Sequence, residues 1–144
     1  MVTFSEALRS IAIQIPESTV RQWQEKQELL SSLENLMNQE LRPILETVQL
    51  HYLQNEGKIT LTTLDTTLTL RLAWDCHQPE DICSHGQEHA ISLKLHPEEA
   101  VTVLIGNHSR HISRLPLSRE DWRELVQDEI LVALQNHLVC LCSR

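Results

Sequence analysis

The sequence predicts an α+β fold with N-terminal helices, a four- to five-stranded antiparallel sheet, and a C-terminal helix packed on the sheet. Apolar residues recur at helical spacing over residues 3–55, alternate over residues 58–115, and return to helical spacing over residues 118–139. Helices followed by strands and then by a helix are typical of an α+β layout. Because 144 residues suit one domain, we expect residues 1–144 to form a single unit.

The first element is expected to be a short helix that begins near Thr3. Thr3 and Glu6 have the spacing of a capping box, in which the two side chains satisfy backbone N–H groups of the first turn. Pro16 ends this helix, because a residue that precedes proline is disfavoured in the α conformation. Four apolar residues follow the cap at helical spacing: Phe4, Leu8, Ile11 and Ile15.

A longer helical segment is expected from Pro16 to about Gln54. Pro43 lies inside it and cannot donate a backbone hydrogen bond, so a kink or break is predicted near residues 39–43. Gly57 follows the last apolar position and is expected to act as the C-terminal cap.

The middle of the chain has the alternation that is typical of half-buried strands. Residues 59–62 carry apolar side chains at odd positions, whereas residues 68–74 carry them at even positions. A tight turn or a bulge at residues 64–66 would produce this change of phase. Further strands are expected at residues 91–95, 101–105 and 111–115.

The C-terminal helix is expected to start with a second capping sequence at Ser118, shortly after Pro116. A helix that covers a sheet needs one apolar stripe, and this helix carries more apolar residues than that. The surplus is interpreted as a partner-binding surface, and the alternative is a wide core that covers it. The residues assigned to the partner contact are Leu131, Val132, Leu138 and Leu141.

Composition argues against several kinds of partner and cofactor. The formal net charge of −8 disfavours nucleic acid and anionic membrane surfaces, so neither is expected as a partner. The three glycines are far apart, so they cannot form a phosphate-binding loop, and no cofactor is expected. The sequence shows neither a signal peptide nor an apolar run of membrane-spanning length, which predicts a cytoplasmic protein with free thiols.

The polar stretch of residues 75–89 is the longest expected loop and the best candidate for metal chemistry. Thiolate and imidazole are the usual ligands of zinc, although the spacing here is not the tight pair of a zinc knuckle. A zinc site is therefore the alternative to a solvated loop. Its candidate ligands are Cys76, His77, Cys83, His85 and His89.

Two further polar groups are weaker candidates for a chemical site. Glu98 and Glu99 are adjacent and share one environment, whereas acid–base catalysis needs carboxylates whose pKa values differ. Arg110 lies among histidines and could bind an anion, with a solvated hairpin as the simpler interpretation. No complete catalytic constellation is found, so we do not expect an enzyme.

These observations favour a non-catalytic protein–protein interaction module, such as a small assembly factor, adaptor or chaperone-like protein. It would act through apolar helix surface, on a protein partner or by self-association as a homodimer. The alternative is a zinc-binding domain that uses the Cys/His-rich loop of residues 76–89.

Overall fold

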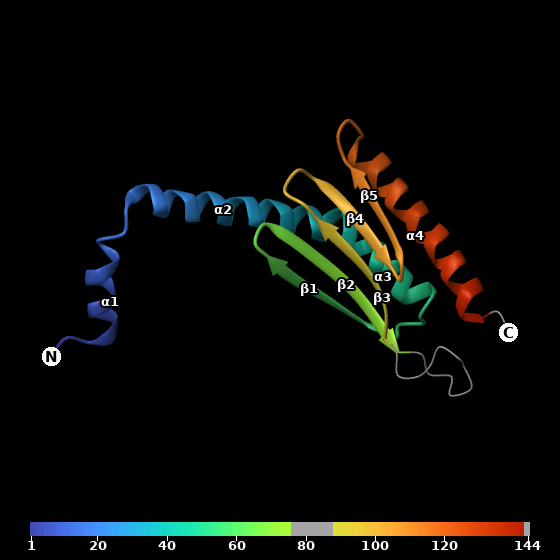
Figure 1. Ribbon diagram of the computed structural model, residues 1–144, viewed down its shortest axis with the longest axis horizontal. Helices are drawn as coiled ribbons and strands as arrows, with labels where there is room; N and C mark the ends of the chain where they lie inside the picture. Colours follow the sequence, from blue (N-terminus) through green and yellow to red (C-terminus); the bar gives the residue numbers. More distant parts are fainter. Residues whose placement is uncertain (76–87, 143–144) are drawn as a thin grey trace.

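The computed structural model describes the backbone of residues 1–75 and 88–142, and all of their side chains except those of residues 88 and 137–142. Its element order confirms the predicted α+β layout (Figure 1). The elements are α1 (Phe4–Ala12), α2 (Glu17–Leu36), the π-helical segment η1 (Met37–Leu41), α3 (Arg42–His51), β1 (Lys58–Leu64), β2 (Thr67–Asp75), β3 (Glu88–Leu95), β4 (Ala100–Ile105), β5 (His108–Ser113) and α4 (Arg119–Cys142).

The five strands form one antiparallel meander in the order β1-β2-β3-β4-β5. Leu64 pairs with Thr67 across the β1–β2 turn, so only two residues separate the paired strands. Odd positions of β1 therefore face even positions of β2, and Leu61 pairs with Leu70. The change of phase in the sequence is explained by this tight turn, with Asp65 at a φ of 55°.

The last strand begins three residues earlier and ends two residues earlier than the sequence predicts. Gly106 and Asn107 form the β4–β5 turn, with Gly106 at a φ of 57°, and Ile105 pairs directly with His108. This tight turn brings residues 108–110 into the sheet, so the predicted strand at residues 111–115 was wrong at both ends.

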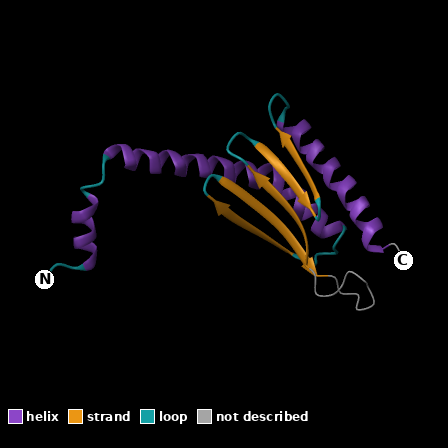
Figure 2. Cartoon of the chain, in the orientation of Figure 1, coloured by secondary structure: helices purple, strands orange, loops and turns teal. Residues whose placement is uncertain are grey.

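One face of the sheet carries the core, and the other is open. Among the described residues, the helices that cover the sheet, which are the C-terminal part of α2, α3 and α4, lie on one side of the strands (Figure 2). Leu70, Leu93 and Val103 lie side by side on the covered face and are fully buried. The open face carries polar side chains at the alternate positions, such as Thr69, Lys94 and Thr102, so the alternation has its expected cause.

Helices α2 and α3 form one rod that is interrupted by η1 rather than broken. Pro43 cannot donate a hydrogen bond to the carbonyl one turn earlier, and the helix widens over Met37–Leu41. Met37 and Leu41 are fully buried, which fixes this segment against the core. The kink or break predicted near residues 39–43 is thus realised as a π-turn.

The cap predicted at Gly57 was wrong, because α3 ends several residues earlier, with Tyr52 as its C-cap. Gly57 instead lies directly before β1 at a φ of 89°. A side chain there would approach the Ala73 carbonyl oxygen to 2.9 Å, so the position requires glycine. Its own carbonyl accepts a 3.0 Å hydrogen bond from Gln49 Nε2, which ties α3 to the start of the sheet.

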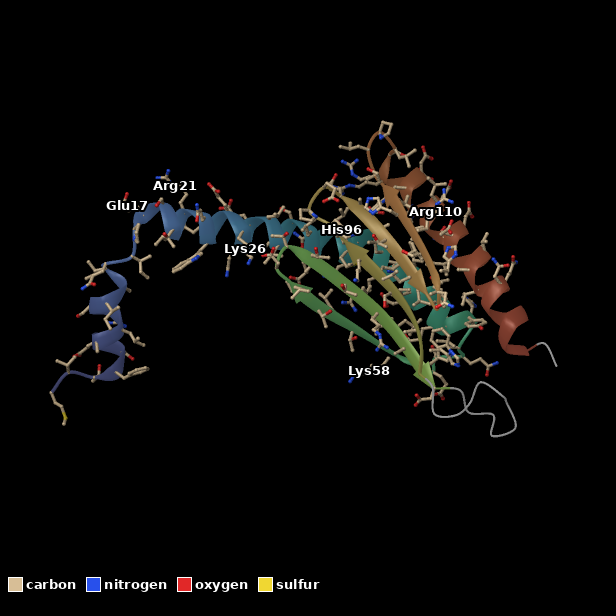
Figure 3. The ribbon with its side chains drawn as sticks, in the orientation of Figure 1. Glu17, Arg21, Lys26, Lys58, His96 and Arg110 are labelled. Atoms are coloured by element: carbon tan, nitrogen blue, oxygen red, sulfur yellow. The ribbon has the colours of Figure 1, made fainter. Side chains whose placement is uncertain are left out.

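Helix α1 has the predicted capping box but lies apart from the sheet (Figure 1). The Glu6 backbone N–H donates to Thr3 Oγ1 at 3.1 Å, and the Thr3 N–H donates to Glu6 Oε2 at 3.3 Å. All nine residues of α1 are exposed. The adjoining part of α2, which carries Glu17 and Arg21, also extends beyond the sheet (Figure 3).

Two polar contacts join the α2–α3 rod to other elements of the fold. Lys26 of α2 forms a 3.1 Å ion pair with Asp65 at the tip of the β1–β2 hairpin. Arg123 of α4 donates to Glu40 of η1 at 3.0 Å. These contacts join elements that are distant in the sequence and position α4 beside the α2–α3 rod.

Candidate functional site

An apolar groove of about 540 Å³ runs between α3 and α4. Its two walls have the same helical spacing, because each helix contributes positions i, i+3, i+4, i+7 and i+8. The α3 wall comprises Ile44, Thr47, Val48, His51 and Tyr52, and the α4 wall comprises Gln127, Ile130, Leu131, Leu134 and Gln135.

The floor and the rim of this groove differ in burial. Ile44, Ile130 and Leu134 are buried and belong to the core. Leu131 is 57% exposed and Tyr52 is 36% exposed, so large apolar side chains stand on both sides of the opening. No Asp, Glu, Lys or Arg is among the described residues that line the groove. Such a surface suits an apolar partner group better than a charged one.

The groove ends near a packed aromatic cluster. Tyr52 meets Trp74 edge to face, with ring centroids 6.2 Å apart, and Trp74 lies 5.9 Å from the His89 ring. Contacts of this kind restrict ring motion and favour a fixed arrangement. The position of Tyr52 at the end of α3 is therefore set by the sheet beneath it.

The four residues predicted to contact a partner differ in their position relative to the groove. Leu131 lines the groove. Val132 is 49% exposed but is not among the residues that line the groove. Leu138 and Leu141 belong to α4, while their side chains lie outside the described part of the chain. The predicted contact surface thus remains a prediction, with Leu131 at a defined concave site.

The sequence missed the α3 half of the groove. The sequence predicts helix over this segment, and Ile44 and Leu45 are buried. The sequence feature that could have indicated a groove is the placement of the polar residues Thr47 and His51 directly before the apolar residues Val48 and Tyr52. That spacing indicates a stripe that is only partly covered, but it does not identify the opposite wall.

Of the five candidate zinc ligands, His89 alone lies within the described residues. Cys76, His77, Cys83 and His85 lie outside the described residues. His89 belongs to β3, which begins at Glu88, and it is 8% exposed beside Trp74 on the covered face. Within residues 1–75 and 88–142, no group of three or more His, Cys, Asp or Glu side chains is arranged to hold a metal ion.

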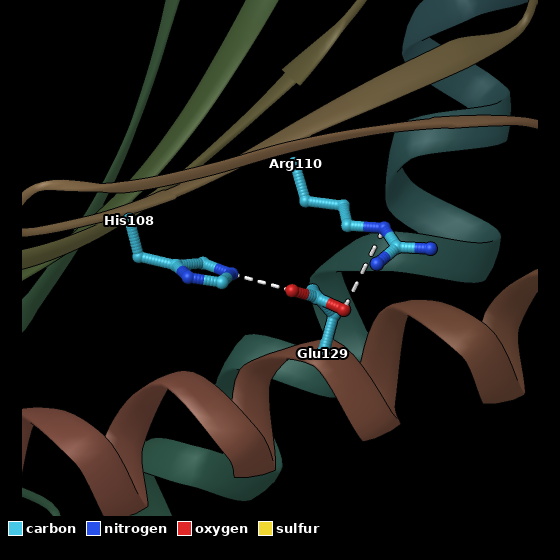
Figure 4. Close-up of polar contacts among 3 residues, drawn as sticks. All are labelled: His108, Arg110 and Glu129. Atoms are coloured by element: carbon cyan, nitrogen blue, oxygen red, sulfur yellow. Dashed lines mark hydrogen bonds and ion pairs between the residues drawn. The ribbon is translucent and has the colours of Figure 1, made fainter.

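The cluster that suggested an anion site is occupied by a carboxylate of the chain itself. His108 Nε2 hydrogen-bonds to Glu129 Oε1, and Arg110 Nε lies 3.8 Å from Glu129 Oε2 (Figure 4). The Glu129 side chain is only 14% exposed, so α4 places it against β5. Arg110 and His108 therefore hold α4 to the sheet rather than offering an open site for an anion.

Other polar residues around β4 and β5 also contact one another. Glu99 forms an ion pair with Arg114, so it is not one half of an isolated carboxylate pair. On the open face, Thr102 Oγ1 lies 2.8 Å from His96 Nε2 and 3.2 Å from His111 Nδ1. These contacts link His96, Thr102 and His111 across the polar face of the sheet.

Comparisons with known proteins add no relative to this description. No family model, curated protein or solved structure matches the chain. Within the described residues, no helix has both the length and the apolar character needed to span a membrane.

Proposed function

We propose that this chain is a non-catalytic protein-interaction module that binds a partner protein in the α3–α4 groove. The observation that carries the proposal is the groove itself, which presents the exposed Leu131 and Tyr52 beside a buried apolar floor. Apolar helix faces of a partner commonly bind in such grooves. An assembly factor, adaptor or chaperone-like protein would use this kind of surface.

The choice of a protein partner rests on the shape and the chemistry of the opening. Two parallel rows of side chains at helical spacing create an elongated depression rather than a closed cavity. The polar residues that line it include no carboxylate, lysine or arginine, so the opening offers few groups that could fix a small charged ligand. An amphipathic helix would bury the leucine and leave its own polar face in water.

Site-specific photocrosslinking in the native host tests this proposal. A benzophenone side chain at Gln127, which lines the groove, should crosslink to one specific protein, either a different protein or a second copy of this chain. The matched control is the same group at the neighbouring exposed residue Asp128, which does not line the groove. Reconstitution with the identified protein should then show at least about tenfold weaker binding for Leu131→Glu.

A second leucine provides the control for that substitution. Leu125 is 45% exposed on α4 and lies outside the groove, so Leu125→Glu should leave binding unchanged. The proposal is wrong if the two crosslinking positions give the same products, or if Leu131→Glu binds the reconstituted partner as well as the original chain does.

A further inference from the structure

Helix α1 has an apolar stripe that nothing in the described chain covers. Phe4, Leu8 and Ile11 occupy positions i, i+4 and i+7 and are 80%, 49% and 61% exposed. A helix of nine residues is marginal in water when it stands alone, because few backbone hydrogen bonds repay its nucleation. A partner surface that buries the stripe would stabilise it.

The α3–α4 groove has the size and the chemistry that this stripe needs. From Phe4 to Ile11 the stripe is about 10.5 Å long, and from Gln127 to Gln135 the groove wall is about 12 Å long, at the rise of an α-helix. Positions i, i+4 and i+7 are the usual anchors of a helix in an apolar groove. Glu6 and Arg9 are the charged residues of α1 and cancel, so its docking onto an uncharged wall needs no ion pair.

The chain cannot make this contact with itself while α2 stays intact. The 20 residues of α2 span about 30 Å as a continuous helix that runs into η1 and α3. Figure 1 shows α1 at one end of this rod and the α3–α4 pair at the other. The stripe and the groove are therefore available to each other only between two molecules.

We infer that α1 of one copy docks in the α3–α4 groove of a second copy, and that two copies exchange these helices reciprocally. The inference rests on the proposed function, since it names the occupant of the same groove. Reciprocal exchange closes the assembly as a dimer, because each copy supplies one α1 and one groove. A basic amphipathic helix would instead suggest an anionic membrane, and α1 does not have that excess of positive charge.

The test uses two variants of the full chain, each defective in one half of the contact. Leu8→Glu places a charge on the α1 stripe, and Leu131→Glu places one in the groove. Sedimentation equilibrium should show a dimer for the unmodified chain. For each variant alone, the dissociation constant of the dimer should be higher by at least about tenfold. Ile13→Glu and Leu125→Glu are the matched controls, since both residues are exposed and lie outside the stripe and the groove, respectively.

Mixing the two defective variants separates this arrangement from any other dimer. In a mixed pair, the intact α1 of the Leu131→Glu chain can enter the intact groove of the Leu8→Glu chain. Association should therefore reappear in the mixture, at a strength between the variants and the unmodified dimer. Below the concentration at which copies associate, the circular dichroism of each variant should match that of the unmodified chain, since both substituted residues are exposed.

Two results would overturn the inference. One is an unmodified chain that sediments as a monomer at micromolar concentration, and the other is a mixture that associates no better than its components. In either case, Leu131-dependent crosslinking from Gln127 to a different protein would leave the proposed function standing. If that crosslinking were also absent, both proposals would fall.

Discussion

Helices α1 and α4 begin with similar caps, but one is exposed and the other is packed on the sheet. Each starts with a hydroxyl cap: Glu6 N–H donates to Thr3 Oγ1 at 3.1 Å, and Asp121 N–H donates to Ser118 Oγ at 3.1 Å. Each then carries an amphipathic stripe. In α4 that stripe is buried against the sheet, whereas all of α1 is exposed. A cap and a stripe thus specify that a helix forms, but not which surface covers it.

The comparison is sharpest at the first aromatic residue of each helix. Trp122 is fully buried, and its Nε1 donates to the Ile112 carbonyl at 3.1 Å, while Phe4 is 80% exposed. Trp122→Ala should lower the free energy of unfolding by about 3–5 kcal/mol through the cavity and the lost hydrogen bond. Phe4→Ala should change it by less than about 0.5 kcal/mol when measured below the concentration at which copies associate.

Urea unfolding followed by circular dichroism measures both values. Equal losses for the two substitutions would mean that α1 belongs to the same cooperative unit as the sheet, contrary to its position in Figure 1.

The ionic contacts of α4 should contribute less to the free energy of unfolding than the buried Trp122 does. Glu129→Gln removes the carboxylate that meets His108 and Arg110, and should lower the free energy of unfolding by about 1 kcal/mol. The Arg110 side chain is 64% exposed, so solvent screening keeps the effect modest. Asp128→Asn on the adjacent exposed position is the control, and its unfolding curve should overlay that of the unmodified chain.

The two caps give a matched pair of substitutions. Ser118→Ala should reduce global stability by about 1 kcal/mol, because α4 unfolds together with the sheet that it covers. Thr3→Ala should instead leave global unfolding unchanged and raise amide exchange within Phe4–Ala12. Hydrogen exchange with mass spectrometry distinguishes these outcomes, and slow exchange in α1 of the Thr3→Ala monomer would contradict them.

A substitution in the groove should also have only a small effect on stability. Leu131→Glu should change the free energy of unfolding by less than about 0.5 kcal/mol, because the side chain is 57% exposed. Calorimetry at low protein concentration checks this value. A loss comparable to that of Trp122→Ala would show that Leu131 serves the core rather than a contact surface.

Much of the fold could be predicted because local signals and burial agree. The change of phase between residues 59–62 and 68–74 indicated a tight turn, and Leu64 does pair with Thr67. The errors at β5 and at Gly57 have one cause. Glycine marks a change of backbone direction, but its function as a turn, a cap or a close approach depends on the strand beside it. For Gly57 that neighbour is Ala73, which follows it by 16 positions in the sequence.

The candidate site was less predictable than the fold. Leu131 could be selected because it exceeds what one buried stripe needs, and it lines the groove. The opposite wall at Val48 and Tyr52 depends on how α3 and α4 pack, and no local pattern encodes that distance. Arg110 was ambiguous for the same reason, since its partner Glu129 lies in another element.

The π-turn at Met37–Leu41 has a consequence for how the chain tolerates changes of length. A π-helical turn contains one residue more than an α-helical turn. The flanking helices α2 and α3 nevertheless both direct their apolar faces toward the core. Asn38 is exposed within it. Deleting Asn38 would convert the widened turn to an ordinary one while Leu36 and Ile44 still face the core. Elsewhere in the rod, the loss of one residue would rotate every later side chain by about 100°.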